Sequence, residues 1–75
     1  MARILFFGIT RDITGVSDMH SSTADLQLLL NDLKQQFPQL EKVRFRVAVN
    51  NALTSDNTIL GVNDTVALLP PFAGG

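Results

Sequence analysis

Apolar positions along much of the chain follow strand-like spacings. Five short runs are rich in β-branched and aromatic residues or alternate between apolar and polar positions, and each run predicts a strand. The runs cover residues 3–8, 16–21, 44–50, 52–54 and 65–69. The first run is continuously apolar, so we expect it to form a central strand with a neighbour on each side.

Between the second and third runs the apolar spacing becomes that of a helix. Five apolar residues recur at i, i+3, i+4, i+7 and i+11, which places them on one helical face. These residues are Leu26, Leu29, Leu30, Leu33 and Phe37. Ser22 or Thr23 can cap the N-terminus, Asp25 then lies in the first turn, and Pro38 ends the element. The pattern predicts one amphipathic helix over roughly residues 23–37.

Turn signals separate the predicted elements. Residues 9–15 are mostly polar, close with a glycine and predict a turn. Asn50-Asn51 and Asn63-Asp64 predict two further turns, because asparagine tolerates the left-handed backbone conformation. Pro70-Pro71 ends the last strand.

The order of these elements, β-β-α-β-(β)-β, indicates a single α+β domain. A hairpin, a crossover helix and a strand that returns beside the first one make the β-grasp arrangement. We therefore expect a mixed sheet of four to five strands with one main helix packed on one face, over residues 1–69. Leu30 and Leu33 are expected in the core between helix and sheet. Residues 70–75 are expected to form an extended C-terminal tail.

One helix covers only one face of a sheet, yet the two central strands carry apolar residues on both faces. Phe7 alternates with Phe6, and Leu69 alternates with Leu68. Single exposed apolar residues are ordinary on any protein. The same excess on two central strands instead predicts an apolar patch that binds a partner, formed by Phe7, Leu69 and the nearby Leu53.

The chain closes on a distinctive run, Pro70-Pro71-Phe72-Ala73-Gly74-Gly75. The two prolines hold the chain extended as it leaves the last strand. Gly74 and Gly75 then present a carboxylate with no side chain around it, and such a tail can enter a narrow channel in another protein. The alternative is an ordinary terminus that happens to carry two glycines.

Residues that carry catalytic chemistry are few among the 75 of the chain. The absence of cysteine excludes a disulfide or a catalytic thiol, and a serine triad would have to use the single histidine, His20. Six basic and seven acidic residues give a net charge of −1, so we expect no nucleic-acid or anionic membrane partner. The longest apolar run has four residues, so we expect no membrane span or signal peptide and, by default, a cytoplasmic location. With no cysteine and one histidine, we also expect no bound metal.

Four isolated positions have simple interpretations. His20 lies near the end of a strand and is expected to be a solvated edge residue. Arg11 either anchors its turn or contacts an acidic partner, and the sequence leaves both open. Arg44 and Arg46 are expected to form a solvated strand face.

Several motifs resemble the small subunits of molybdopterin synthase. Leu5-Phe6-Phe7-Gly8, with Arg11-Asp12 and Gly15, resembles the opening of these proteins. Their second half is matched by three further segments, Val49-Asn50, Asp64-Thr65-Val66-Ala67 and the Pro-Pro-Phe-Ala-Gly-Gly ending. The resemblance covers essentially the whole chain, and the ending is its specific part. Asn63-Asp64-Thr65 departs from the usual Gly-Asp-Glu; Asn63 can supply the left-handed turn, whereas Thr65 lacks the carboxylate.

The resemblance implies a ubiquitin-like sulfur carrier that is not catalytic alone. A ubiquitin-activating-type adenylyltransferase would use ATP to adenylate Gly75, next to Gly74, and no cofactor would be bound permanently. A sulfur donor such as a cysteine desulfurase system would then supply the sulfur of a thiocarboxylate. The large synthase subunit, in a heterotetramer, would accept the tail and convert precursor Z into the dithiolene of molybdopterin. The residues expected at partner interfaces are Phe7, Arg11, Leu53, Leu69, Pro70, Pro71, Phe72 and Ala73.

The sequence also allows other functions. Sulfur carriers for thiamine, cysteine or tRNA thiolation share the Gly-Gly end, although the thiamine carrier is usually shorter and lacks the Pro-Pro-Phe ending. A ubiquitin-like modifier would instead be joined through Gly75 to lysines of target proteins. A plain interaction module with an inert tail is a third class.

Overall fold

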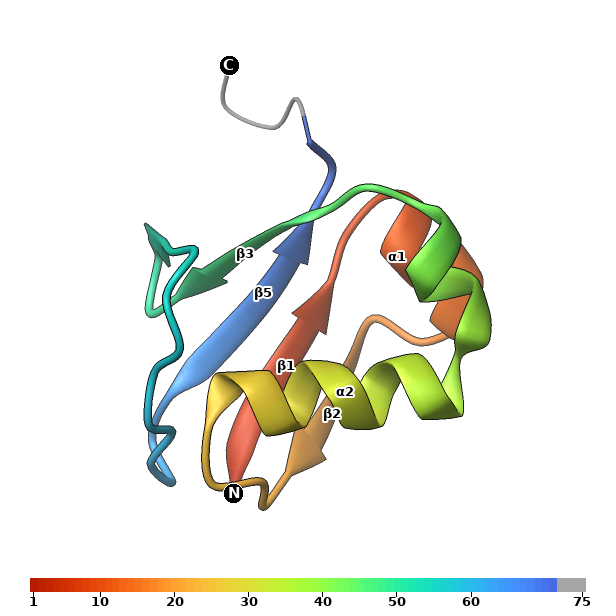
Figure 1. Cartoon of the computed structure of the whole chain (residues 1–75). Helices are drawn as coiled ribbons and strands as arrows, with labels where there is room; N and C mark the ends of the chain where they lie inside the picture. The colour runs from red at the N-terminus through yellow and green to blue at the C-terminus, as the bar shows by residue number, and fades with distance from the viewer. Residues whose placement is uncertain (72–75) are drawn as a thin grey trace.

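The computed structural model describes residues 1–71, which form five strands, two α-helices and a 3₁₀-helix (Figure 1). The elements in order are β1 Ala2–Phe6, α1 Ile9–Thr14, β2 Asp18–Ser21, α2 Leu26–Gln36, η1 Pro38–Lys42, β3 Arg46–Val49, β4 Ala52–Leu53 and β5 Thr65–Leu69. None of the helices in this part of the chain is long and apolar enough to span a membrane.

The strands form one mixed sheet in the order β2-β1-β5-β3-β4. β1 pairs antiparallel with β2 and parallel with β5, and β3 pairs antiparallel with β5 and β4. The predicted α+β β-grasp fold is therefore confirmed, and β1 has a neighbour on each side, as its continuous apolar run predicts.

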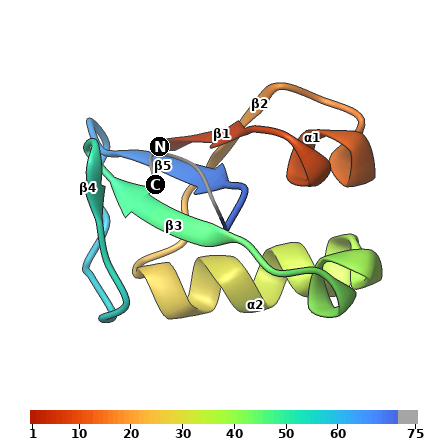
Figure 2. The same ribbon diagram turned by 90° about the horizontal axis from the view of Figure 1, so that it is seen from above.

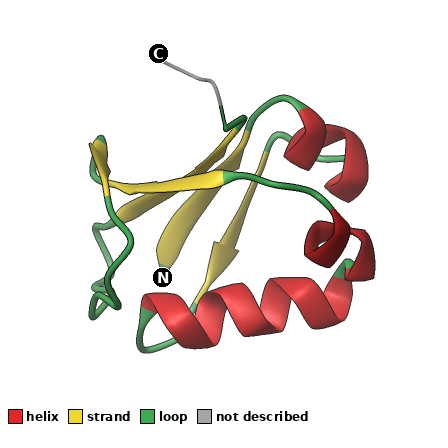
Figure 3. Ribbon diagram, turned by 45° about the horizontal axis from the view of Figure 1, so that its top comes forward, coloured by secondary structure: helices red, strands yellow, loops and turns green. Residues whose placement is uncertain are grey.

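The core lies between the sheet and α2, which covers one face (Figure 2). Alternate residues of β1 and β5 meet the leucines of the helix. The buried cluster is Ile4, Phe6, Leu26, Leu29, Leu33, Leu40, Val66 and Leu68. Leu33 is in the core as predicted, whereas Leu30 is only half-buried and packs against the cluster from its side. The helices lie along one side and one end of the sheet (Figure 3).

The turn predicted for residues 9–15 is wrong, because most of this segment is the short helix α1. Gly8, with φ of 59°, turns the chain out of β1 and into the helix. At the other end Gly15 is left-handed, and its N–H donates to the Arg11 carbonyl at 2.8 Å. Ile13 packs against the core cluster. Two glycines, the packing of Ile13 and the buried side chain of Thr10 therefore hold a helix whose composition is otherwise typical of a loop.

α2 begins at Leu26, three residues later than predicted from the sequence. Asp25 is the N-cap rather than a residue of the first turn, and its side chain accepts the Leu28 N–H at 2.8 Å. Ser22 and Thr23 therefore lie outside the helix. The end is close to the prediction, since α2 stops at Gln36.

The predicted strands are confirmed in number, but four of the five are shorter than expected. The Asn50-Asn51 turn is confirmed, with φ values of 51° and 70°. The left-handed conformation predicted for Asn63 is wrong, since no other non-glycine residue among residues 1–71 has positive φ. That turn is held instead by Asp64, whose Oδ2 accepts the Gly61 N–H at 2.7 Å.

Candidate functional site

The first part of the candidate site is the start of the C-terminal tail, Pro70 and Pro71, which we call the tail root. β5, the last strand, lies between β1 and β3, so the chain leaves from the middle of the sheet (Figure 1). Pro70 is half-buried and Pro71 is exposed. The other predicted tail residues lie outside the described part of the chain: Phe72, Ala73, Gly74 and Gly75.

Thr10 ties the ends of β1 and β5 together next to this root. Its side chain is fully buried. Its Oγ1 donates to the Phe7 carbonyl at 2.7 Å, lies 3.2 Å from the Leu68 carbonyl, and accepts the Phe7 N–H at 3.0 Å. Sequence reasoning missed this role because it placed Thr10 in a turn. The available signal was a threonine two residues after Gly8, because a threonine hydroxyl often forms hydrogen bonds with backbone groups a few residues away.

The sheet face opposite α2 carries an apolar patch. Strand register places Leu53 opposite Ala48, Ala48 opposite Ala67, and Ala67 opposite Leu5. Phe6 pairs with Leu68, and both face the core. Successive side chains of a strand point to opposite faces, so the next residues, Phe7 and Leu69, point to the open face. The open-face patch consists of Leu5, Phe7, Leu53, Ala67 and Leu69. The structure therefore places the three predicted patch residues, Phe7, Leu53 and Leu69, on one face.

Exposure differs across the open-face patch. Phe7 is 44% exposed and Leu53 is 49% exposed. Leu5, Ala67 and Leu69 are half-buried and form its floor. Contiguous apolar surface of this kind is typical of a protein–protein contact site.

Charged side chains surround the open-face patch. Arg3 and Asp18 form an ion pair at 3.1 Å, and Arg46 lies opposite Leu69 in the strand register. Arg11 is exposed and lines a shallow hollow of about 260 Å³ together with Phe7. In the described part of the chain the Arg11 side chain makes no hydrogen bond or ion pair, so contact with an acidic partner remains its prediction.

The remaining polar groups serve the fold. His20 is exposed on the edge strand β2, as predicted. Hydrogen bonds from the Gly61 N–H and then the Asn50 amide lower the pKa of Asp64 below its usual value, and both partners belong to turns. Within residues 1–71 no three His, Asp or Glu side chains gather closely enough to hold a metal ion.

Comparison with known proteins gives matches over nearly the whole chain. The ThiS family profile matches residues 4–75. The molybdopterin synthase sulfur carrier subunit of Arabidopsis thaliana is 37% identical, over 97% of this chain and 81% of its own length. The protein of the same name from Mycobacterium tuberculosis is 31% identical, over 96% of this chain and 94% of its own.

Solved structures show the same fold. Small archaeal modifier protein 1 of Methanosarcina acetivorans superposes with a TM-score of 0.83 at 20% identity, over 99% of this chain and 95% of that one. A chain in the complex of subunits 1 and 2 of the Helicobacter pylori molybdopterin-converting factor gives a TM-score of 0.74 at 30% identity. There the match covers 99% of this chain and 97% of that one.

Proposed function

The chain belongs to the ThiS family, and we propose that within this family it is the sulfur carrier subunit of molybdopterin synthase. The observation that carries the proposal is its near full-length similarity to two curated relatives with that name, at 37% and 31% identity. The Helicobacter pylori complex supports it, since a chain 30% identical to this one occurs in that two-subunit assembly.

The proposed chemistry takes place at the carboxylate of Gly75. A ubiquitin-activating-type enzyme joins this carboxylate to the α-phosphate of ATP, and pyrophosphate leaves. A donor such as a cysteine desulfurase system supplies a persulfide, whose outer sulfur attacks the acyl carbon, and AMP leaves. A second thiol of the donor system then cleaves the S–S bond, which releases the thiocarboxylate and leaves a disulfide on the donor. Because the chain has no cysteine, no thiol side chain is available to carry the sulfur, and the terminal carboxylate is the group that remains.

The resulting thiocarboxylate is the sulfur donor. In the proposed reaction the large subunit receives the tail, and two successive transfers convert precursor Z into the dithiolene of molybdopterin. Acid–base groups and the substrate pocket come from the large subunit, since the described residues of this chain converge on no such site.

Two structural features suit this role. The tail root is rigidly placed, because β5 is an interior strand and Thr10 bonds to the backbone of Phe7, directly after β1, and of Leu68 in β5. The open-face patch lies on the same sheet and offers an apolar surface to the activating enzyme and the large subunit in turn. A carrier needs both features, since each partner must grip the domain while the tail reaches its active site.

Intact-mass measurement of the full chain tests the loading step. After incubation with ATP, the activating enzyme and a sulfur source, we expect the mass increase of one oxygen replaced by sulfur. Two matched variants, one lacking Gly74 and Gly75 and one with an alanine added after Gly75, should stay unloaded while keeping the fold, as checked by circular dichroism. Addition of the large subunit and precursor Z should then give molybdopterin with the unaltered chain alone.

Other outcomes point elsewhere. A loaded chain that yields no molybdopterin indicates a carrier for thiamine, cysteine or tRNA thiolation. Adducts through Gly75 to lysines of other proteins indicate a modifier. Molybdopterin formation by the chain that lacks Gly74 and Gly75 contradicts the carrier proposal.

A further inference from the structure

The outer edge of β3 is only partly covered. β4 pairs with Ala48 and Val49 alone, and the last bond on this side runs from the Thr54 N–H to the Val47 carbonyl at 3.0 Å. Backbone groups alternate between the two edges of a strand, so those of Phe45, directly before β3, point to the same side as those of Val47. In the described part of the chain no strand pairs there, and such an edge is open to an added strand.

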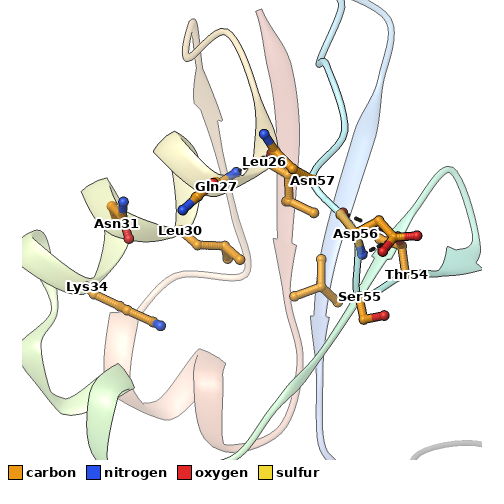
Figure 4. Close-up of a pocket in the computed structure, with 10 residues that line it drawn as sticks. Leu26, Gln27, Leu30, Asn31, Lys34, Thr54, Ser55, Asp56 and Asn57 are labelled. Carbon is orange, nitrogen blue, oxygen red and sulfur yellow. Dashed lines mark hydrogen bonds between the residues drawn. The ribbon is translucent and has the colours of Figure 1, made fainter.

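A groove follows this edge. A hollow of about 620 Å³ begins where Pro71 leaves the sheet, a second of about 420 Å³ follows β3, and a third of about 500 Å³ lies against α2. Val47 lines all three hollows, and each pair of them shares two further lining residues, so the hollows adjoin one another; together we call them the β3 groove. At its far end Leu26 and Gln27 of α2 lie on one side and residues 54–57 on the other (Figure 4).

The end of the β3 groove near the tail root is positively charged. Lys34, Arg44 and Arg46 line the hollow there, and Glu41 is its one acidic residue. Among residues 1–71 the only ion pair is Arg3–Asp18, so none of these cations is neutralised by a close carboxylate. This local surplus runs against the net charge of −1 for the chain.

We propose that the β3 groove binds an extended acidic segment of the protein that receives the C-terminal tail. The segment would pair with the backbone at Phe45 and place alternate side chains in the hollows, while its carboxylates meet Lys34 and Arg44. The identity of that protein as the large synthase subunit rests on the proposed function. The groove itself rests on the open edge, the hollows and the charge.

Charge-reversal variants of the full chain test the contact with the purified large subunit by titration calorimetry. Lys34→Glu and Arg44→Glu should each weaken binding about tenfold or more, since each places a like charge against the acidic segment. Lys42→Glu is the matched control: it makes the same charge change on η1, outside the groove, and should alter the Kd less than about twofold. The difference should shrink in high salt, which screens charge. The proposal would be overturned if Lys34→Glu and Arg44→Glu changed the Kd no more than the control Lys42→Glu does.

A peptide probe tests the groove without any tail chemistry, so its result is separate from the fate of the carrier proposal. The heptapeptide Glu-Val-Glu-Val-Glu-Val-Glu is titrated into the labelled full chain and followed by amide NMR. Shifts should centre on Phe45, Arg46 and Lys34 and should be weaker with the glutamine version of the peptide. Shifts confined to other surfaces, equal shifts with both peptides, or shifts at these amides on simple concentration of the free protein would each contradict the inference. The last result would mean that a second copy fills the groove.

Discussion

Gly8 and Pro70 pack so closely that Gly8 has no room for a side chain. A Cβ there would lie 2.6 Å from Cγ of the Pro70 ring, and the glycine has φ of +59°. Gly8 joins the end of β1 to the start of α1, while Pro70 is the first residue after β5. The chain therefore turns at Gly8 directly against the tail root, and this contact sets where Pro70 lies.

Gly8→Ala is expected to destabilise the domain for two reasons, backbone strain and the clash with Pro70. Gly15→Ala separates them, because Gly15 also has positive φ, +76°, but nothing lies within 4 Å of its added Cβ. Strain alone should cost about 1–2 kcal/mol in Gly15→Ala, and Gly8→Ala should cost more. Urea denaturation of both variants measures this. An equal loss would show that the Pro70 ring moves aside without cost.

Asp64 is the centre of a small hydrogen-bond network at the start of β5. Its Oδ1 accepts the Asn50 Nδ2 at 2.9 Å, and the Asn50 Oδ1 in turn accepts the Thr65 N–H at 2.9 Å. The bond from the Gly61 N–H and then the bond from Asn50 lower the pKa of Asp64, because both favour the charged carboxylate. The network links the β3–β4 turn to the start of β5.

Acid should weaken the fold through this carboxylate. Since its pKa in the folded state lies below the unfolded value of about 3.9, its stabilising contribution is complete above that value and is lost as pH falls through the folded pKa. In Asp64→Asn the melting temperature should therefore fall at neutral pH and depend less on pH in the acid range. Asp32→Asn, at an exposed position on α2, is the control. Identical pH profiles for Asp64→Asn and the unaltered chain would contradict the assignment.

Local patterns predicted the elements whose causes are local. The Asn63-Asp64 turn signal and the two prolines after Leu69 gave β5 its bounds, and the tolerance of asparagine for positive φ located the Asn50-Asn51 turn. α1 was missed because its support is distant in sequence: the Thr10 hydroxyl reaches the Leu68 carbonyl, 58 residues away. Six mostly polar residues carry no signal of such a contact.

The start of α2 shows the same limit. Ser22, Thr23 and Asp25 are all good caps, so the sequence could not choose among them. The choice follows from a distant loop, since Leu26 N–H donates to the Thr58 carbonyl and Gln27 N–H to the Asn57 side chain, both at 2.8 Å. These bonds satisfy helix N–H groups that lack partners within the helix.

The two proposed binding surfaces differ in the same way. The open-face patch follows from strand alternation and was predicted with its residues Phe7, Leu53 and Leu69. The β3 groove depends on how short β4 is and on where α2 passes, and neither is encoded in the alternation of the residues that line it.

The helix register gives a third prediction. Leu33 is 3% exposed within the core cluster, whereas Leu30 is half-buried and faces the β3 groove. Leu33→Ala should lower the free energy of unfolding by about 2–5 kcal/mol, a large share for a domain of this size. Leu30→Ala leaves a site that solvent can partly fill and should cost clearly less. Urea denaturation compares them, and a greater loss for Leu30→Ala would mean that α2 is rotated about its axis.

The last prediction concerns the open-face patch as a partner surface. Phe7 and Leu28 are similarly exposed, at 44% and 50%, but Phe7 belongs to the open-face patch whereas Leu28 lies on α2, across the sheet from it. Phe7→Ala should weaken binding of the large synthase subunit by about 2 kcal/mol or more, as expected for an aromatic anchor at an interface. Leu28→Ala, which removes apolar surface of similar exposure on α2, should leave binding nearly unchanged. Leu69→Asp should also weaken binding, because it places a charge on the floor of the patch. Titration calorimetry measures the binding and thermal melts the stability of each variant. Exposed side chains contribute little to the fold, so neither alanine variant should lose much stability. A Phe7→Ala variant that binds as tightly as Leu28→Ala would mean that the patch is ordinary apolar surface.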